Sequence, residues 1–420
     1  MSFDYQKTIC YCGHDCARCL TYLATINNDE ELRKQSQNFY KTEFGIDIPL
    51  KDIYCLGGRS EDILYLCREC PFTKCCKENN VEICVNCSKY PCKQIHDYQK
   101  KYVNKCNQIN WPQRNNVMRN LTQPQLMKMD KWMQDNARPY DLAKWNYLFN
   151  GGSKDAIVEE MLKYQNADGG MGSGFEADVL CPLSAAIPTA EAIFQSYEYG
   201  LDFDSEWMKR ILSYFENTVQ DIPKYWEDCP KEAIDYPHAP WWNYAPCTVF
   251  NPNPCAVVAS AFIRYGTDSQ KELGYKIAGD CLKLLVSTDF CGDHDTLNIQ
   301  ALVDQLIAIN SPLITDEVMV AMRRRILENT CFDVSKYNSY YFTPFDYISS
   351  PNSVWYDTVG HGIEQTIDFW LDNINEQGVW TPNFSWGVDN EVSKQVTKNW
   401  TGYITVKRAK ILLNFNRIEI

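Results

Sequence analysis

Cysteines at metal-binding spacing mark the start of the chain. Cys12, Cys16 and Cys19 are spaced Cys-x3-Cys-x2-Cys, and two Cys-x2-Cys pairs follow at 67–70 and 84–87, with 13 residues between the pairs. A Cys-x2-Cys turn directs two sulfurs at one ion, and a zinc ion or an iron–sulfur cluster takes about four thiolates. The spacing therefore predicts two thiolate metal sites in this region.

The distribution of cysteine supports metal binding over disulfides. Thirteen of the 20 cysteines lie within residues 1–106. The first residues lack a basic segment followed by an apolar run, and no stretch approaches the roughly 18 apolar residues of a membrane span. We therefore expect a cytoplasmic protein with no membrane partner. Thiols stay reduced in that compartment, which favours metal thiolates.

The identity of the metal is open at this point. Zinc is expected for a small thiolate-rich domain, because metal binding supplies folding free energy that a loop-rich module lacks. An iron–sulfur cluster is the alternative, since Cys-x3-Cys-x2-Cys is also the cluster spacing of radical S-adenosylmethionine enzymes. Such an enzyme would continue with about 200 residues of alternating strands and helices. No such pattern follows, so a radical enzyme is the third interpretation.

The segments "YCGHDCARCLTYLAT" and "CRECPFTKCCKENNVEICVNCSKYPCKQI" together resemble a small Cys-rich bacterial and archaeal domain of unknown function, over about residues 9–96. The resemblance implies a metal ligand set and no reaction. That family often has Cys-x-Gly-Cys in mid-domain, whereas "CLGG" here places Gly58 at the second cysteine, which leaves the role of Cys55 open. The implied ligands are Cys12, Cys16, Cys19, Cys67, Cys70, Cys75, Cys84, Cys87 and Cys92.

The charge distribution argues against a nucleic-acid partner. Residues 1–106 carry 15 Lys+Arg and 14 Asp+Glu, a net charge of +1, and the remainder carries 26 and 40, a net charge of −14. An acidic large domain repels the phosphates of nucleic acid and of anionic lipid. We expect a small-molecule or peptide ligand instead.

The rest of the chain has the pattern of an all-α protein. We assign residues 107–137 to a connecting helix, whose Leu126, Met129, Trp132 and Met133 share one face. Residues 138–420 form a second domain with helices such as "SKDAIVEEMLKYQ", where Ser153 is a candidate N-cap. "PTAEAIFQSYEYG" (188–200) and "PCAVVASAFIRYG" (254–266) align as an internal repeat, which is typical of stacked helical hairpins.

"YQNADGGMGSGFEADV" (164–179) contains Gln165-x2-Asp168-Gly169-Gly170 and resembles the repeat of the terpenoid cyclase and protein prenyltransferase superfamily. The resemblance covers residues 138–420 and is to bacterial members without an assigned reaction. It implies an α/α-toroid of helical hairpins around a pocket, fused here to the Cys-rich module. In that family Asp-Gly-Gly makes a tight turn with positive φ.

The metal and acid motifs of that superfamily are missing. Neither Asp-x-Asp-Asp nor Asp-Asp-x-x-Asp occurs in the chain. Prenyltransferases and lanthionine cyclases bind zinc through Cys, His and Asp, which Cys291, Asp293 and His294, with His361, could supply. The alternative is that His294 lies in a helix-capping loop and Cys291 is buried.

Polar and aromatic residues in loops are the better candidates for a pocket, because loops before inner helices converge at one mouth of such toroids. Aromatic rings with a few carboxylates bind apolar or cationic ligands, and a buried carboxylate can transfer protons. We expect a toroid enzyme, a transferase, lyase or cyclase, with a metal- or redox-sensing binding protein as the alternative. The catalytic candidates are Glu176, Asp178, His238, His294 and Asp346, and the binding candidates are Trp241, Trp242, Trp386 and Trp400.

Overall fold

The computed structural model divides the chain into two compact units, Met1–Val117 and Met118–Ile420. Within the described residues, helices make up nearly all regular structure and β-pairing is limited to isolated bridges, so the predicted mainly α class is confirmed. No helix in these residues is long and apolar enough to cross a membrane. The structure describes residues 10–12, 16, 19–68, 70–81, 84, 87, 89, 92–94, 119–220, 225–244, 249–289 and 291–419, the side chains of Glu43 and His361 excepted.

The first unit is a set of short helices linked by cysteine-bearing loops. Helices α2 and α3 pack against each other, and the side chain of Asp29 caps α3 by accepting the N–H groups of Glu31 and Leu32. The N–H of Cys84 donates to the carbonyl of Tyr11 at 2.8 Å, which joins the last Cys-x2-Cys pair to the first cysteine segment. The helices are α2 (Leu20–Ile26), α3 (Glu30–Phe44), η2 (Leu50–Asp52), α4 (Tyr65–Arg68) and α5 (Pro71–Glu78).

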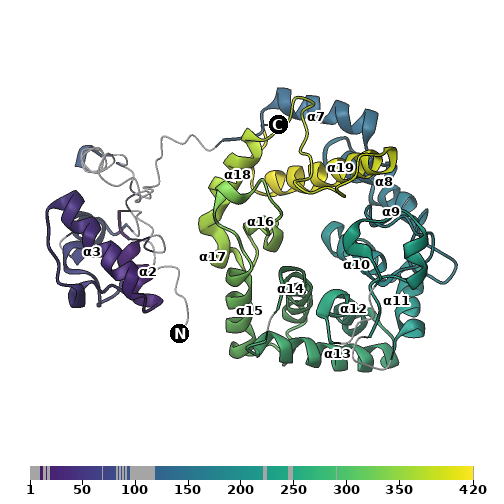
Figure 1. The fold of residues 1–420 in the computed structure, drawn as a ribbon, viewed down its shortest axis with the longest axis horizontal. Coiled ribbons are helices and arrows are strands. Elements are labelled where there is room, and N and C mark those ends of the chain that lie inside the picture. The colour runs from purple at the N-terminus through teal and green to yellow at the C-terminus, as the bar shows by residue number, and fades with distance from the viewer. Residues whose placement is uncertain are drawn as a thin grey trace. The chain divides into compact units, whose positions relative to one another are not determined.

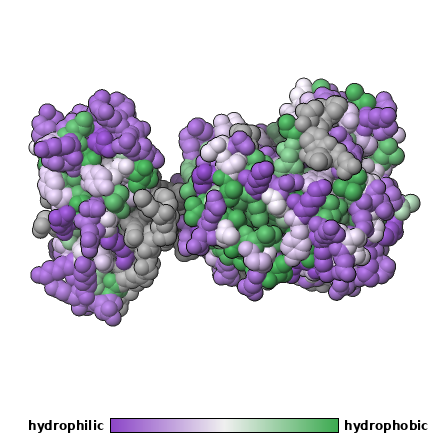
Figure 2. Space-filling view, turned by 90° about the horizontal axis from the view of Figure 1, so that it is seen from below, coloured by the Kyte–Doolittle hydropathy of each residue, from purple (hydrophilic) through white to green (hydrophobic). Residues whose placement is uncertain are grey.

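The second unit contains two layers of helices. In Figure 1, α10, α12 and α14 lie toward its middle, and α11, α13 and α15 lie around them. Its surface shows apolar patches among polar side chains (Figure 2). The helices are α7 (Gln123–Asn136), α8 (Pro139–Phe149), α9 (Lys154–Leu162), α10 (Ala186–Tyr199), α11 (Glu206–Thr218), α12 (Pro252–Tyr265), α13 (Asp268–Val286), α14 (Asp293–Ala308), α15 (Asp316–Glu328), α16 (Pro344–Tyr347), α17 (Tyr356–Val359), α18 (Ile363–Asp372) and α19 (Glu391–Asn414).

The repeated segments form neighbouring inner helices. Helix α12 is apolar on nearly every side and packs against α10, α13 and α14, as expected of a helix surrounded by others. The hydroxyl of Tyr197 on α10 lies 3.0 Å from that of Ser260 on α12. Gly200 ends α10 in the left-handed conformation, with φ of 59°, whereas Gly266 follows α12 in an extended conformation.

Other sequence-predicted helices also form. Ser153 caps α9 by accepting the N–H of Ala156 at 3.2 Å. The expected connecting helix is α7, which lies in the second unit with Met129 and Met133 fully buried, while Leu126 and Trp132 pack at the edge of the core. The predicted residues 107–118 lie outside the described part of the chain.

A tight turn between α9 and α10 fixes the loop that carries Glu176 and Asp178. Gly169 has φ of 95°, as predicted for the Asp-Gly-Gly segment. The carboxylate of Asp168 accepts the N–H of Gly170 and the hydroxyl of Ser184. The amide of Gln165 donates to the carbonyls of Gly169 and Trp207, so the turn is tied to the start of α11.

We predict that Gly169→Ala destabilises the second unit more than Gly387→Ala does. Both glycines have positive φ, but a Cβ on Gly169 would lie 2.2 Å from the carbonyl oxygen of Arg210, whereas a Cβ on Gly387 would meet nothing within 4 Å. Backbone strain at positive φ costs about 1–3 kcal/mol, so the difference between the variants reports the clash. Urea unfolding of the full chain measures both, and equal losses of unfolding free energy would contradict the role of this turn.

Candidate functional site

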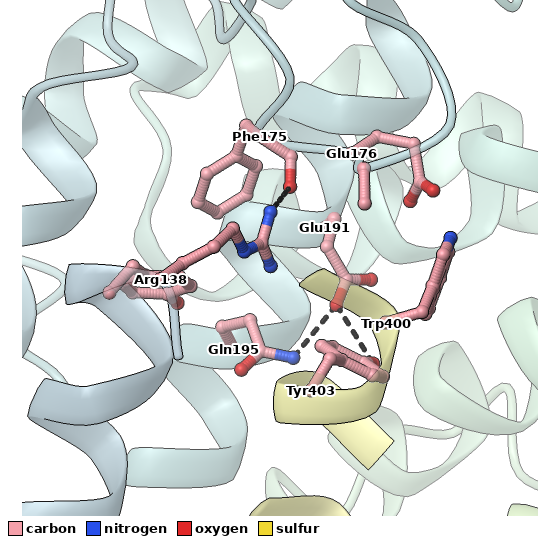
Figure 3. Close-up of a pocket in the computed structure, with 9 residues that line it drawn as sticks. Arg138, Phe175, Glu176, Glu191, Gln195, Trp400 and Tyr403 are labelled. Carbon is pink, nitrogen blue, oxygen red and sulfur yellow. Dashed lines mark hydrogen bonds between the residues drawn. The ribbon is translucent and has the colours of Figure 1, made fainter. Parts of the chain in front are cut away.

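A pocket lies among the start of α8, the loop before α10, and helices α10 and α19. Its cavity volume is about 10 Å³, which is room for about one water molecule. Figure 3 shows Glu191 near its centre, with Glu176 and Trp400 on one side and Arg138 reaching toward Phe175. The lining residues are Arg138, Tyr140, Phe175, Glu176, Ala177, Glu191, Gln195, Trp400 and Tyr403.

Arg138 holds the loop that carries Glu176. Its guanidinium donates to the carbonyls of Gly174 and Phe175 at 3.1 and 3.2 Å and to the carboxylate of Asp141 at 2.7 Å. Asp141 is fully buried and also pairs with Lys144 at 2.9 Å. Burial alone would raise the pKa of Asp141, but the two cations outweigh burial and hold that pKa below its ordinary value. The positive charge of Arg138 is thus engaged outside the centre of the pocket.

Glu176 is the most strongly perturbed carboxyl group of the pocket. Burial raises its pKa to about 8, the negative charges of Asp178 and Glu191 raise it further, and Arg138 opposes them. Glu176 is therefore protonated at neutral pH, which is the state of a proton donor.

Glu191 faces the same space from the middle of α10. Its carboxylate accepts the amide of Gln195 at 2.7 Å and the hydroxyl of Tyr403 at 3.3 Å. Burial raises the pKa of Glu191, while these hydrogen bonds and Lys144 act in the opposite direction. Two carboxyl groups with different surroundings thus share one pocket.

Asp178 gathers three of the predicted binding tryptophans. Its carboxylate accepts the indole N–H groups of Trp241, Trp386 and Trp400 at 3.2, 2.8 and 2.9 Å. Burial raises the pKa of Asp178, and the three donors limit that rise. We call Asp178 and these three residues the indole cluster. It lies beside the pocket, because Trp400 belongs to both.

The remaining predicted site residues lie elsewhere. Both ring nitrogens of His238 are engaged within its own loop, by the carbonyl of Tyr236 and the side chain of Asn243. Asp346 caps α16 through Thr343 and pairs with Lys407 at 2.7 Å. Trp242 is buried in a small separate core with Val179 and Cys229, so it packs rather than binds.

The zinc ligands suggested for the second unit are not brought together. His294 lies 2.9 Å from the hydroxyl of Tyr340, and the sulfur of Cys291 lies 3.6 Å from the hydroxyl of Thr296. Asp293 accepts the backbone N–H of His294. The side chain of His361 lies outside the described residues.

In the first unit two pairs of cysteine sulfurs lie close together. The sulfurs of Cys76 and Cys84 are 3.5 Å apart, and the sulfur of Cys10 lies 3.3 Å from that of Cys16. Burial raises the pKa of Cys67, and the charges of Cys19, Cys55, Cys16 and Cys12 raise it further. Burial also raises the pKa of Cys84, with Cys76, Cys12 and Cys75 acting in the same direction.

Backbone N–H groups are directed at several of these sulfurs. Gly57 donates to Cys55 at 3.4 Å, and Gly58 donates to Cys16 at 3.1 Å. Such donors stabilise thiolates, the form that binds metals. The donor chemistry thus suits zinc or an iron–sulfur cluster. Even so, no three His, Cys, Asp or Glu side chains in the described ranges are already arranged to hold a metal ion.

Some residues of both sites escaped prediction from the sequence. Glu191, Gln195 and Tyr403 line the pocket from α10 and α19, and Arg138 lines it from the residue before α8. The sequence shows Glu191 only as one of two glutamates in the repeated segment "PTAEAIFQSYEYG". In the first unit, Cys10 lies beside Cys16 and Cys76 lies beside Cys84, although Cys10 and Cys76 fall outside the family spacing.

We predict that Glu176→Gln changes the pH dependence of stability. Between the usual carboxyl pKa of about 4.3 and about 8, the unfolded chain has lost this proton while the folded chain keeps it. The free energy of unfolding therefore falls as pH rises through this range, and the variant loses that contribution. Urea unfolding between about pH 5 and pH 8 should give a less negative slope for Glu176→Gln. Glu159→Gln, at an exposed position on α9, should keep the wild-type slope, and a Glu176→Gln slope equal to it would refute the raised pKa.

Comparison with known proteins gives a partial match. Residues 8–97 match the family described as "Protein of unknown function (DUF3795)", which agrees with the resemblance drawn from the cysteine spacing. Neither a curated protein nor a solved structure matches the chain. The family assignment thus covers the Cys-rich region alone.

Proposed function

We propose that the second unit is an α/α-toroid enzyme of the terpenoid cyclase and prenyltransferase type, which binds a small organic cation, or a substrate that becomes positive as it reacts. Three features support the toroid: the two layers of helices, the packing of the repeated helices α10 and α12, and the positive-φ turn at Gly169. The pocket beside the indole cluster is the binding site in this proposal.

The observation that carries the proposal is the charge balance of the pocket. Each nearby cation is paired with another carboxylate: Arg138 and Lys144 with Asp141, and Lys407 with Asp346. Across the described part of the chain, no ion pair within 4.0 Å joins Glu176, Asp178 or Glu191 to Lys or Arg. With Glu176 protonated at neutral pH and Arg138 engaged by Asp141, the pocket presents the carboxyl group of Glu191 beside the aromatic rings of Trp400 and Tyr403, a combination that attracts cations.

Glu176 is the proton donor in this proposal. A carboxylic acid with a pKa of about 8 is protonated at neutral pH and can protonate an oxygen or nitrogen leaving group. Such an acid is too weak to protonate a carbon–carbon double bond efficiently. The pocket therefore favours group transfer or elimination over proton-initiated cyclisation. Glu191 and Asp178 would stabilise the positive charge that develops.

We further propose that the first unit binds zinc through its cysteines. Zinc would neutralise thiolates whose mutual repulsion otherwise keeps them protonated. The N–H groups of Gly57 and Gly58 already favour the thiolate form of Cys55 and Cys16. Because no three of the described cysteines are yet arranged to hold one ion, binding would draw their sulfurs together. An iron–sulfur cluster would make the purified protein brown, and zinc would leave it colourless.

We predict that the pocket binds choline and discriminates against its neutral isostere, 3,3-dimethylbutan-1-ol. Because the cavity has room for about one water molecule, binding requires side chains of its lining to move apart. Isothermal titration of the full chain at about pH 7 should show at least about tenfold tighter binding of choline, equivalent to about 1.4 kcal/mol. Affinity for choline should rise between about pH 7 and pH 9, because Glu176 ionises in that range and adds a negative charge. Equal binding of the two probes, or binding of neither, would contradict the proposal.

Two variants and a control locate the binding. Glu191→Gln should weaken choline binding, and Glu176→Gln should remove the rise with pH while the affinity at pH 7 changes little. Asp304→Asn is the matched control, because Asp304 is a half-buried carboxylate that accepts an indole N–H, from Trp355 at 2.6 Å, outside the pocket. Asp304→Asn should bind choline like the wild type. A loss of binding in the control as large as in Glu191→Gln would refute this location.

A further inference from the structure

The environment of Gly58 shows that the Cys10 side chain occupies the space of a residue-58 side chain. A Cβ built on Gly58 would lie 1.9 Å from the sulfur of Cys10, about the length of a carbon–sulfur bond, and 3.1 Å from the Cβ of Cys10. The sulfur of Cys10 and a side chain at position 58 therefore cannot both be present without a shift of one of them. A side chain at position 58 would clash with the Cys10 thiol.

The backbone of Gly58 does not itself require glycine. Its φ lies outside the left-handed region, unlike that of the preceding Gly57, whose φ is 109°. Conformation alone would allow any residue at position 58, so it is the Cys10 side chain that excludes one there. Exchange of the thiol from position 10 to position 58 removes the contact with the sulfur. It leaves the Cβ and Cα of residue 10 at 3.1 and 3.3 Å from the new Cβ, so one of them must shift by a few tenths of an ångström.

The sulfur of Cys10 lies beside the sulfur of Cys16, which accepts a backbone hydrogen bond. The N–H of Gly58 donates to the sulfur of Cys16 at 3.1 Å, and the sulfur of Cys10 lies 3.3 Å from the same atom. Cys10 also contacts the thiol of Cys12. Cys10 and Cys16 are thus close enough to bind one ion after a small adjustment, since sulfurs that share a tetrahedral zinc are about 3.8 Å apart for zinc–sulfur bonds of about 2.3 Å.

We propose that Cys10 is a metal ligand that acts with Cys16, and that its thiol fills the ligand position that residue 58 could otherwise supply. Cys10 lies outside the spacing that implied the ligand set, so sequence pattern alone assigns it no role. The inference rests on the proposed binding of zinc by the first unit. The inference adds Cys10 to the implied ligands, and it predicts that a cysteine at position 58 can replace Cys10 in that role.

The test is the exchange of the thiol between the two positions. The full chain is prepared as wild type, Cys10→Ala, Cys10→Ala/Gly58→Cys and Cys331→Ala, the last removing a cysteine of the second unit as a control. Zinc content and affinity are measured by competition with a chromophoric chelator, and thiolate coordination is followed by the absorption of the Co²⁺-loaded protein. Circular dichroism of each variant confirms that it is folded.

We expect Cys10→Ala to weaken zinc binding at one site by about tenfold or more and to reduce the thiolate-to-cobalt absorption. The double variant should recover both, because the sulfur introduced at position 58 lies in the vacated space. Cys331→Ala should match the wild type. Unchanged binding in Cys10→Ala, or no recovery in the folded double variant, would overturn the inference while leaving zinc binding intact. A wild-type protein that binds neither metal would overturn both the inference and the proposed zinc binding.

Discussion

The carboxylate of Asp178 joins four parts of the second unit that are far apart in the sequence. It accepts N–H groups from Trp241, Trp386 and Trp400, which are 63, 208 and 222 residues away. Three donors compensate much of the cost of burying a carboxylate, and hydrogen bonds to a charged acceptor are stronger than neutral ones. The loop before α10, the turn at 240–242, the segment that carries Trp386 and the first half of α19 are thereby held together, and Trp400 is fixed as a wall of the pocket.

The protonation state of Glu176 depends on this arrangement of carboxyl groups and hydrogen-bond donors. The carboxyl groups of Asp178 and Glu191 accept three and two side-chain hydrogen bonds, which oppose the rise of their pKa values. The rise of the pKa of Glu176 is opposed by the charge of Arg138 and by the backbone N–H of Asp178. Acidic groups in such different surroundings ionise at different pH, which is how one site obtains a proton donor and a charged carboxylate together. Arg138 could have neutralised Glu176, but Asp141 and two backbone carbonyls already engage it.

Local patterns predicted much of this structure, and contacts between distant residues account for what they missed. The turn at Gly169 and the Ser153 cap of α9 depend on neighbouring residues, so the sequence predicted them. The sequence predicted the same binding role for the adjacent Trp241 and Trp242. In the structure Trp241 donates to Asp178, whereas Trp242 lies in the small core with Cys229 and Val179. Glu191 has no local mark of function, because Gln195 and Tyr403 surround it only in the folded chain.

In the first unit, too, sequence spacing cannot identify a cysteine that reaches the others only in the folded chain. Spacing identifies cysteines that one turn can direct at an ion, but Cys10 reaches Cys16 because residue 58 has no side chain. The thiols are also poor nucleophiles as they stand, since burial and neighbouring sulfurs raise the pKa values of Cys67 and Cys84. A metal must displace these protons to bind, so metal affinity would fall in acid. Thiols with such raised pKa values thus become thiolates, and so ligands or nucleophiles, only where a cation displaces their protons.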